Sequence, residues 1–398
     1  MHDTKISRRQ AALLCCAALT GKSEQSSDRI RLLRTPSAGL QPQICLDAQG
    51  ILHLVYFSGE PRQGDLFYTR SSDGGATFSS AIRVNSQSGS AIATGTIRGA
   101  QLAIGKNGRV HIAWNGSQTA EPVGPLNPDS GKPGAPMLYS RVNAASNGFE
   151  PQRNLMVRSF GLDGGGSVAA DRAGNVYVAW HGIGAVDAKK AGEEGEARRQ
   201  VWITKSVDDG RSFSGEEKAW AQKTGACGCC GMKIFSGAQG NIAALYRSAT
   251  GNVHRDIYLL TSIDRGRTFR GGLLHKWEIN ACPMSSMDIA ESGKTLVGAW
   301  ETGGQVYWAR LDQKEQPISA PGIGKGRKHP RLAVNRNGEV LLVWTEGTGW
   351  QKGGSLAWQL YDPSGRATVS SNGEAPAIPA WSFAAVTARI DNSFSILY

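Results

Sequence analysis

The chain has 398 residues, including 51 glycines and 11 tryptophans, and only 19% of its residues are charged. This composition is typical of many short strands joined by tight turns, and no long amphipathic helix is found, so a helical bundle is excluded. The net charge of +11 favours polyanions or acidic sugars at long range, but the lysines and arginines are scattered, so no nucleic-acid partner is expected.

The first segment of the chain, residues 1–25, has the pattern of an export signal. Arg8 and Arg9 precede a short apolar run over residues 11–19, which is too short to span a bilayer but long enough for a signal-peptide core. The string around the two arginines resembles a twin-arginine signal. No later stretch is apolar enough to cross a membrane, so we expect no transmembrane segment. The sequence therefore predicts an exported bacterial protein, periplasmic or extracellular, with one domain over residues 29–398.

A single repeat occurs seven times along this domain. Each copy has a short strand, a tight polar turn and a second strand that ends on an aromatic residue. The closing aromatics are Tyr56, Trp114, Trp180, Tyr246, Trp300, Trp344 and Tyr398. Small and β-branched residues alternate in the strands, and the turns are rich in glycine and asparagine, as expected for the inner hairpins of propeller blades. Seven hairpins predict an all-β propeller with seven blades.

Three of the hairpins that follow carry the motif S-x-D-x-G-x-[ST]-F, over residues 71–78, 206–213 and 262–269. The short carboxylate can accept hydrogen bonds from its own turn, and the glycine permits the reversal of the chain. The motif residues are Asp73, Gly75, Asp208, Gly210, Asp264 and Gly266.

This motif resembles the Asp box, or BNR repeat, of the sialidase superfamily, and the resemblance implies a sialidase-like β-propeller. In that family the boxes lie on outer turns away from the active site, so the motif residues are expected to be structural. Known sialidases have six blades, so the blade number stays open between six and seven.

The two ends of the domain are expected to share a blade. The last inner hairpin ends at Tyr398 with no outer hairpin after it, while a lone β-like segment over residues 29–34 opens the domain. Pairing these segments would close the ring and remove exposed sheet edges.

A sialidase site needs arginines for the sugar carboxylate, a tyrosine nucleophile paired with a glutamate, and an aspartate as acid or base. The candidates near the expected functional face are Arg98, Arg247, Glu301, Arg331 and Glu346. None of them lies in a recognisable family motif, and the Arg-Ile-Pro type of segment expected near the first strand is replaced by residues 41–44, Gln-Pro-Gln-Ile. The alternative for each candidate is an ordinary ion pair.

Cysteines form the most unusual feature of the sequence. Cys227, Cys229 and Cys230 lead into the fourth inner hairpin, and Cys282 leads into the fifth at an equivalent place. The nearby methionines are Met232, Met284 and Met287. We expect these sulfur atoms to converge at one mouth of the propeller channel.

Three interpretations of this cluster stay open. Export favours disulfides, most simply Cys227 with Cys282 and Cys229 with Cys230. Thiolates and thioethers would instead suit copper(I) or another soft metal. The third interpretation is unpaired buried thiols.

The sequence thus allows three functions. The first is a sialidase-like glycoside hydrolase that acts on a glycan. The second is a propeller without catalysis that binds a glycan or a protein. The third is a metal or redox protein that uses the cysteine and methionine cluster.

Overall fold

The structure is a computed structural model that describes residues 29–185, 195–313, 315–324 and 326–398. Within these ranges the regular secondary structure is almost entirely β-strand, joined by turns and loops, with short 3-10 turns such as Pro36–Ala38, Lys106–Gly108 and Gly195–Arg198. No helix in the described part is long and apolar enough to cross a membrane. The predicted export signal, residues 1–25, lies outside the described residues.

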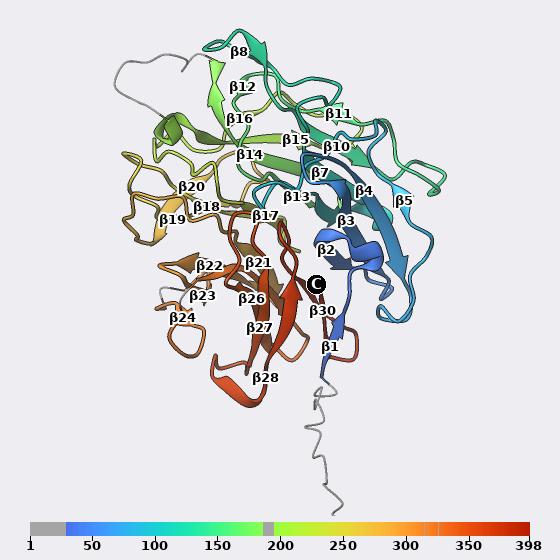
Figure 1. Cartoon of the computed structure of the whole chain (residues 1–398), viewed down its shortest axis with the longest axis vertical. Coiled ribbons are helices and arrows are strands. Elements are labelled where there is room, and N and C mark those ends of the chain that lie inside the picture. The colour runs from blue at the N-terminus through green and yellow to red at the C-terminus, as the bar shows by residue number, and fades with distance from the viewer. Residues whose placement is uncertain (1–28, 186–194, 314, 325) are drawn as a thin grey trace, which may run out of the picture.

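Seven sheets are arranged around one axis, in chain order (Figure 1). Blade 1 comprises β2 (Leu40–Leu46), β3 (Leu52–Glu60), β4 (Gln63–Ser71) and β5 (Ile82–Arg83). Blade 2 comprises β6 (Gln101–Ile104), β7 (Val110–Asn115), β10 (Met137–Arg141) and β11 (Arg153–Asn154). Blade 3 comprises β13 (Ser167–Ala170), β14 (Val176–Gly184), β15 (Gln200–Ser206) and β16 (Glu217–Lys218), with β12 (Ser159–Phe160) paired to β14. A small hairpin of β8 (Leu126–Asn127) and β9 (Lys132–Pro133) lies in the loop after β7.

Blades 4 to 6 repeat the same four-stranded antiparallel order. Blade 4 comprises β17 (Lys233–Ser236), β18 (Ile242–Arg247), β19 (Ile257–Ser262) and β20 (Arg270–His275). Blade 5 comprises β21 (Asp288–Ser292), β22 (Thr295–Thr302), β23 (Gln305–Arg310) and β24 (Ile318–Ser319). Blade 6 comprises β25 (Arg327–Val334), β26 (Val340–Glu346), β27 (Gly354–Tyr361) and β28 (Ala367–Ile378). The first strand of each blade lies nearest the axis.

The seventh blade joins the two ends of the domain. Its strands are β29 (Ala385–Ala388), β30 (Phe394–Leu397) and β1 (Ile30–Leu33), and β1 pairs in parallel with β30. The Phe394 amide donates to the Arg29 carbonyl at 2.7 Å, and the Tyr398 amide donates to the Leu33 carbonyl at 3.1 Å. The red and blue ends of the ribbon therefore meet in one sheet, as expected from the sequence (Figure 1).

The alternation of side chains along each strand explains why the sheets form a ring. In β7, Val110, Ile112 and Trp114 pack against blade 1, whereas Ala113 packs against blade 3. Successive side chains on a strand point to opposite faces of the sheet, so each blade buries apolar groups against both neighbours. A hydrophobic cluster fills each of the seven interfaces between blades. The all-β propeller predicted from the repeat is confirmed, and the blade number is seven.

The three motif turns fold alike and contact a neighbouring blade. Around Asp264, the amide and hydroxyl of Thr268 donate to the carboxylate at 2.9 and 2.6 Å, and the Ser262 hydroxyl donates at 2.7 Å. These bonds lower the pKa of Asp264 well below its usual value. Gly266 has φ +73°, and a Cβ there would lie 2.9 Å from the Tyr177 ring of blade 3. The turn thus needs glycine both for its conformation and for close packing.

The equivalent bonds recur in the other two motif turns. The Thr77 amide donates to Asp73 at 2.9 Å, and the Ser212 amide donates to Asp208 at 2.9 Å. The motif glycines Gly75 and Gly210 also have positive φ, and Phe213 packs edge-on against the Tyr139 ring of blade 2. All three carboxylates serve their own turns in this structure.

Candidate functional site

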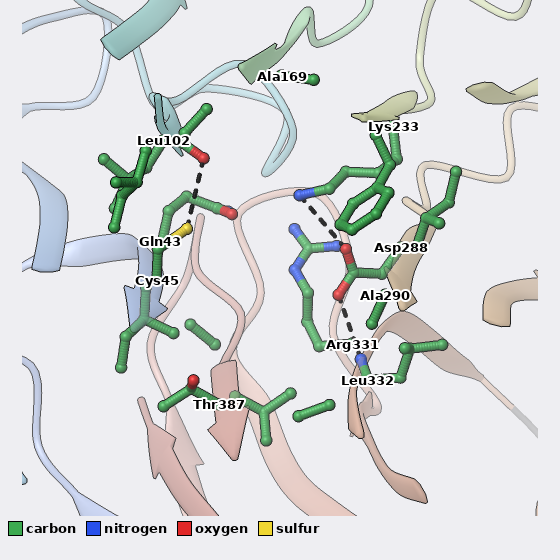
Figure 2. Close-up of a pocket in the computed structure, with 18 of the residues that line it drawn as sticks. Gln43, Cys45, Leu102, Ala169, Lys233, Asp288, Ala290, Arg331, Leu332 and Thr387 are labelled. Atoms are coloured by element: carbon green, nitrogen blue, oxygen red, sulfur yellow. Dashed lines mark hydrogen bonds and ion pairs between the residues drawn. The ribbon is translucent and has the colours of Figure 1, made fainter. Parts of the chain in front are cut away.

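The first strands of the seven blades surround a cavity of about 400 Å³ on the axis. Figure 2 shows Lys233, Asp288 and Arg331 on one side of it, with Cys45 and other small or polar residues on the opposite side. Lys233 Nζ lies 3.4 Å from Asp288 Oδ1. Burial raises the pKa of Cys45 to about 11, against the influence of the Lys233 charge. The channel therefore carries a paired charge and a neutral thiol.

One end of this channel, which we call the mouth, is formed by the segments that precede the first strands. The Gly231 amide, just before β17, donates to the Ser285 carbonyl, just before β21, at 2.9 Å. An ideal Cβ at Gly165 would lie 1.8 Å from the Ile97 carbonyl oxygen, so only glycine fits where these two segments meet. The mouth therefore brings residues that are distant in sequence into contact.

Arg98 and Arg331, two of the candidate arginines, have separate partners. Arg98 forms an ion pair with Asp163 and donates to its carbonyl at 2.6 Å. Arg331 donates to the Ser286 hydroxyl at 3.0 Å, and its guanidinium lies 4.4 Å from the centre of the Phe383 ring. Burial lowers the pKa of Arg331. Both guanidinium groups are used in contacts between blades.

Arg247 and Glu301 form a buried ion pair. Arg247 is fully buried and Glu301 is 2% exposed. Arg247 Nη2 lies 3.1 Å from Glu301 Oε2, and Nη1 donates to the Arg255 carbonyl at 2.9 Å. Burial raises the pKa of Glu301, and the charge of Arg247 opposes this rise. The remaining candidate, Glu346, lies 2.9 Å from Arg327. All five candidate charges are thus engaged, and the three arginines contact different groups.

The most concentrated chemistry at the mouth is a group of three thiols. Cys227 Sγ lies 3.4 Å from Cys229 Sγ and 3.5 Å from Cys230 Sγ, and all three sulfur atoms lie within 4.8 Å of one another. A tight turn holds them together, because the Cys230 amide donates to the Cys227 carbonyl at 3.2 Å. The Cys227 amide in turn donates to the Arg247 carbonyl at 2.9 Å, which fixes the turn on blade 4.

The fourth cysteine approaches the same group from the next blade. One carboxylate oxygen of Glu196 and the sulfur atoms of Cys229 and Cys282 also lie within 4.8 Å of one another. Cys229 belongs to both groups. The structure therefore brings together the four cysteines that the sequence places in neighbouring blades, and adds Glu196. The sequence offered no signal for Glu196 beyond its position in a long charged loop.

Neither of the predicted disulfides is formed in this structure. The five cysteines in the described ranges are all free thiols, and Cys227 Sγ lies 3.4 Å from Cys229 Sγ and 3.5 Å from Cys230 Sγ. A disulfide bond measures about 2.05 Å. Both distances are too long for a covalent bond, so Cys227 contacts its two neighbours as a thiol.

The methionines have different surroundings from one another. Met232 and Met287 are buried in the hydrophobic clusters between blades 3 and 4 and between blades 4 and 5. Met284 lies at the mouth beside His329 and Trp350. The thioethers of Met232 and Met287 therefore contribute to packing between blades.

Positive charges surround the thiols. Burial disfavours the Cys230 thiolate, but hydrogen bonds from Cys227 and Cys229 and the charge of Arg247 lower the pKa of Cys230 well below its usual value. Arg255 Nη1 lies 2.6 Å from Glu196 Oε2. The neighbouring thiols and burial raise the pKa values of Cys227 and Cys229, so Cys230 is the sulfur atom of this group that is favoured as the anion.

A histidine that the sequence gave no specific role lies against the same turn. His181 is fully buried, and neither of its ring nitrogen atoms has a hydrogen-bond partner. An ideal Cβ at Gly164 would be 2.5 Å from His181 Nδ1 and 2.7 Å from the Cys230 carbonyl, so the ring and the turn line one narrow space. Burial lowers the pKa of His181 to about 4, so the ring is neutral.

Comparisons with known proteins show which solved structures have a similar fold. No protein-family model matches the sequence, and no curated protein matches it. Among solved structures, the chain is similar to the Hadza microbial sialidase Hz136, with 14% identity and a TM-score of 0.54 over 82% of this chain and 66% of that one.

Two further solved structures are similar. The Penicillium chrysogenum alpha-L-arabinanase complexed with arabinobiose has 15% identity and a TM-score of 0.54, over 84% of this chain and 98% of that one. The Trypanosoma rangeli sialidase in complex with the inhibitor DANA has 13% identity and a TM-score of 0.51, over 80% of this chain and 54% of that one. The chain thus spans about two thirds of the first sialidase and about half of the second. At these identities the likeness concerns the fold, and the chain has the fold of a sialidase-like β-propeller.

Proposed function

We propose that this protein is a propeller that binds a soft metal, with copper(I) held by the thiolates of Cys227, Cys229 and Cys230 at the mouth of the channel. The observation that carries the proposal is the mutual approach of the three sulfur atoms, at 3.4 and 3.5 Å for the two contacts of Cys227. Thiolates select soft ions such as copper(I).

The spacing of the sulfur atoms supports a single ion between them. A metal–sulfur bond of about 2.3 Å separates the sulfur atoms of a trigonal site by about 4 Å. The three thiols already lie within 4.8 Å of one another, so a displacement of about half an ångström suffices to seat the ion. A tight turn before β17 supplies all three ligands, so binding orders little additional chain.

The charges around the turn support an anionic metal–thiolate group. Three thiolates and one monovalent cation carry a net charge of −2, which is costly to bury without compensation. Arg247 acts on Cys230, and Arg255 acts on both Cys227 and Cys229. These guanidinium groups offset the negative charge.

The proposal is tested by titrating the reduced, full-length protein with copper(I) against a chromophoric copper(I) chelator. We expect at least one ion per chain to be retained, and at least a hundredfold loss of affinity in Cys230→Ser. The matched control is Cys45→Ser, which removes the thiol in the channel, on blade 1, and is expected to bind like the parent. Failure of the parent to retain copper(I), or an equal loss in Cys45→Ser, would overturn the proposal.

A glycoside hydrolase or glycan-binding propeller is the second candidate. It is supported by the similar sialidase and arabinanase folds and by an aromatic pair at the mouth, where Trp350 is 56% exposed and lies edge-on 4.8 Å from Trp381. Aromatic faces of this kind can pack on sugar rings. Assays with a fluorogenic sialoside and with arabinan test catalysis, and binding to a glycan array tests recognition. Activity or binding lost in Trp350→Ala would support this candidate, whereas no turnover and no binding by the parent would remove it.

We also propose that residues 1–25 direct export. Substitution of Arg8 and Arg9 by lysine is expected to retain the protein inside the cell, because a twin-arginine signal depends on both guanidinium groups. Fractionation of cells that express the parent and the double variant measures this. Equal export of both would contradict a twin-arginine route.

A further inference from the structure

We propose that the mouth holds two soft-metal ions that share Cys229 as a bridging ligand. The second ion would be bound by Cys229, Cys282 and the carboxylate of Glu196. This inference rests on the proposed function, because it extends the site formed by Cys227, Cys229 and Cys230.

The geometry provides two sets of three ligand atoms with one member in common. One set is the three thiols of the turn, and the other is Glu196, Cys229 and Cys282; within each set all atoms lie within 4.8 Å of one another. A thiolate sulfur has more than one lone pair, so it can bind two soft cations at once. Cys229 is the only residue in both sets, and it is therefore the residue that can bridge.

Three separate parts of the ring supply the second set. Glu196 comes from the 3-10 turn Gly195–Arg198 in blade 3, Cys229 from the turn before β17, and Cys282 from the segment before β21. These three blades are consecutive, so the ligands meet because the blades pack side by side. A metal here would link blades 3, 4 and 5.

The carboxylate of Glu196 is held in position for this role. The Gly228 amide donates to Glu196 Oε1 at 2.7 Å, and Arg255 Nη1 lies 2.6 Å from Glu196 Oε2. A cross-blade ion pair and a backbone donor thus fix its orientation before a metal arrives. Pre-positioned ligands lose less conformational freedom on binding, which favours affinity.

The two sites differ in their access to solvent. Cys227 and Cys230 are fully buried, whereas Cys282 is exposed and Cys229 lies between these extremes. The outer ion would therefore be reached from solvent and released first, while the inner ion would exchange through Cys229. This order makes the outer site the entry point for the inner one.

The experiment counts copper(I) ions on the reduced, full-length protein, by competition with a chelator and by elemental analysis after desalting. We expect two ions per chain in the parent, one of them at least tenfold weaker and faster to leave. Cys282→Ser is expected to bind one ion with the affinity of the inner site unchanged. Cys229→Ser is expected to weaken both sites, because it removes the shared ligand.

Glu196→Gln tests the carboxylate. It is expected to weaken the outer ion about tenfold and to leave the inner ion unchanged. The matched control is Glu150→Gln, which removes the partner of Arg141, at 2.7 Å, on blade 2 and is expected to change neither site. X-ray absorption at the copper edge of the doubly loaded protein is expected to show a copper–copper distance, which two independent sites would lack.

The outcomes separate this inference from the proposed function. If the parent binds one ion and Cys282→Ser binds the same ion equally well, the second site is refuted and the first stands. If the parent binds none, both are refuted. If Cys229→Ser loses only one of two ions and leaves the other unaltered, the two sites exist without a bridge, which also refutes the inference.

Discussion

The buried pair of Arg247 and Glu301 gives the sharpest test of how the mouth is stabilised. Arg247→Met would remove a fully buried guanidinium and leave the Glu301 carboxylate, which is 2% exposed, without its charge partner. Loss of one member of a buried ion pair costs about 3–5 kcal/mol. For a chain of 398 residues, with an unfolding entropy of about 2.1 cal/mol/K per residue, the melting temperature should fall by roughly 4–6 °C.

The pH dependence of this loss has a definite sign. Burial already raises the pKa of Glu301, and removing Arg247 raises it further, above its value in the unfolded chain. A carboxyl with a raised folded-state pKa is neutral at low pH and becomes a buried unpaired charge as the pH rises. The destabilisation in Arg247→Met should therefore be smaller at pH 5 than at pH 8. Glu301→Gln removes the titrating carboxyl, so the loss of stability that Glu301 causes in the parent as the pH rises should be absent from this variant.

Urea denaturation of Arg247→Met, Glu301→Gln and Glu301→Leu, and of the double variant Arg247→Met/Glu301→Leu, at both pH values measures these effects. The double variant should recover most of the loss, because well-packed apolar groups can replace a buried ion pair. A loss below about 1 kcal/mol in Arg247→Met would refute the reasoning, since it lies far under the expected range for a broken buried pair. So would a double variant whose loss equals the sum of the two single losses.

Three further predictions concern the stability of the propeller. Glu216 is fully buried and accepts hydrogen bonds from the amide and the hydroxyl of Ser159 at 2.8 and 3.0 Å. Glu216→Ala should therefore lower the free energy of unfolding, measured by urea denaturation, by at least about 2 kcal/mol. An unchanged urea midpoint would contradict this prediction. The pKa of Asp264 is lower in the folded state than in the unfolded state, so its ionised carboxylate stabilises the fold above the unfolded-state pKa, and this stabilisation is lost as the pH falls. The melting temperature of Asp264→Asn should therefore fall less on acidification than that of the parent. An equal fall in both proteins would contradict this prediction. Burial lowers the pKa of His329 to about 3, so below pH 6.5 the unfolded state binds more protons than the folded state. The free energy of unfolding of the parent should therefore fall by about 1.4 kcal/mol per pH unit through this residue. His329→Gln should remove this pH dependence between pH 6.5 and 4, and an identical pH dependence in parent and variant would exclude the effect.

Several features of the ring are local enough to be predicted from the sequence. In β7, Val110, Ile112 and Trp114 alternate with His111 and Ala113, a pattern typical of a strand packed on both faces, and the structure confirms it. Each Asp-box turn is a short segment whose hydrogen bonds are made within itself, as between Asp264 and Thr268. The seven-fold recurrence of the hairpin favoured seven blades but left six open, and the structure settles the number because each copy forms one sheet.

Only the tertiary structure decided what the mouth contains. Four cysteines could be assigned to two neighbouring blades from the sequence, but which sulfur atoms approach one another depends on side-chain directions at the ends of different sheets, and the Cys227 sulfur is closest to Cys229 and Cys230. The approach of Glu196 to Cys229 was not predicted, because a residue in a loop of one blade meets the turn before the next blade only when the two blades pack together. The sequence allowed an ion pair for each candidate charge, but only the structure shows that Arg247 pairs with Glu301. Local patterns fix the blades because strand periodicity and turn hydrogen bonds are short-range, whereas the site is made by contacts between blades, which the sequence pattern does not encode.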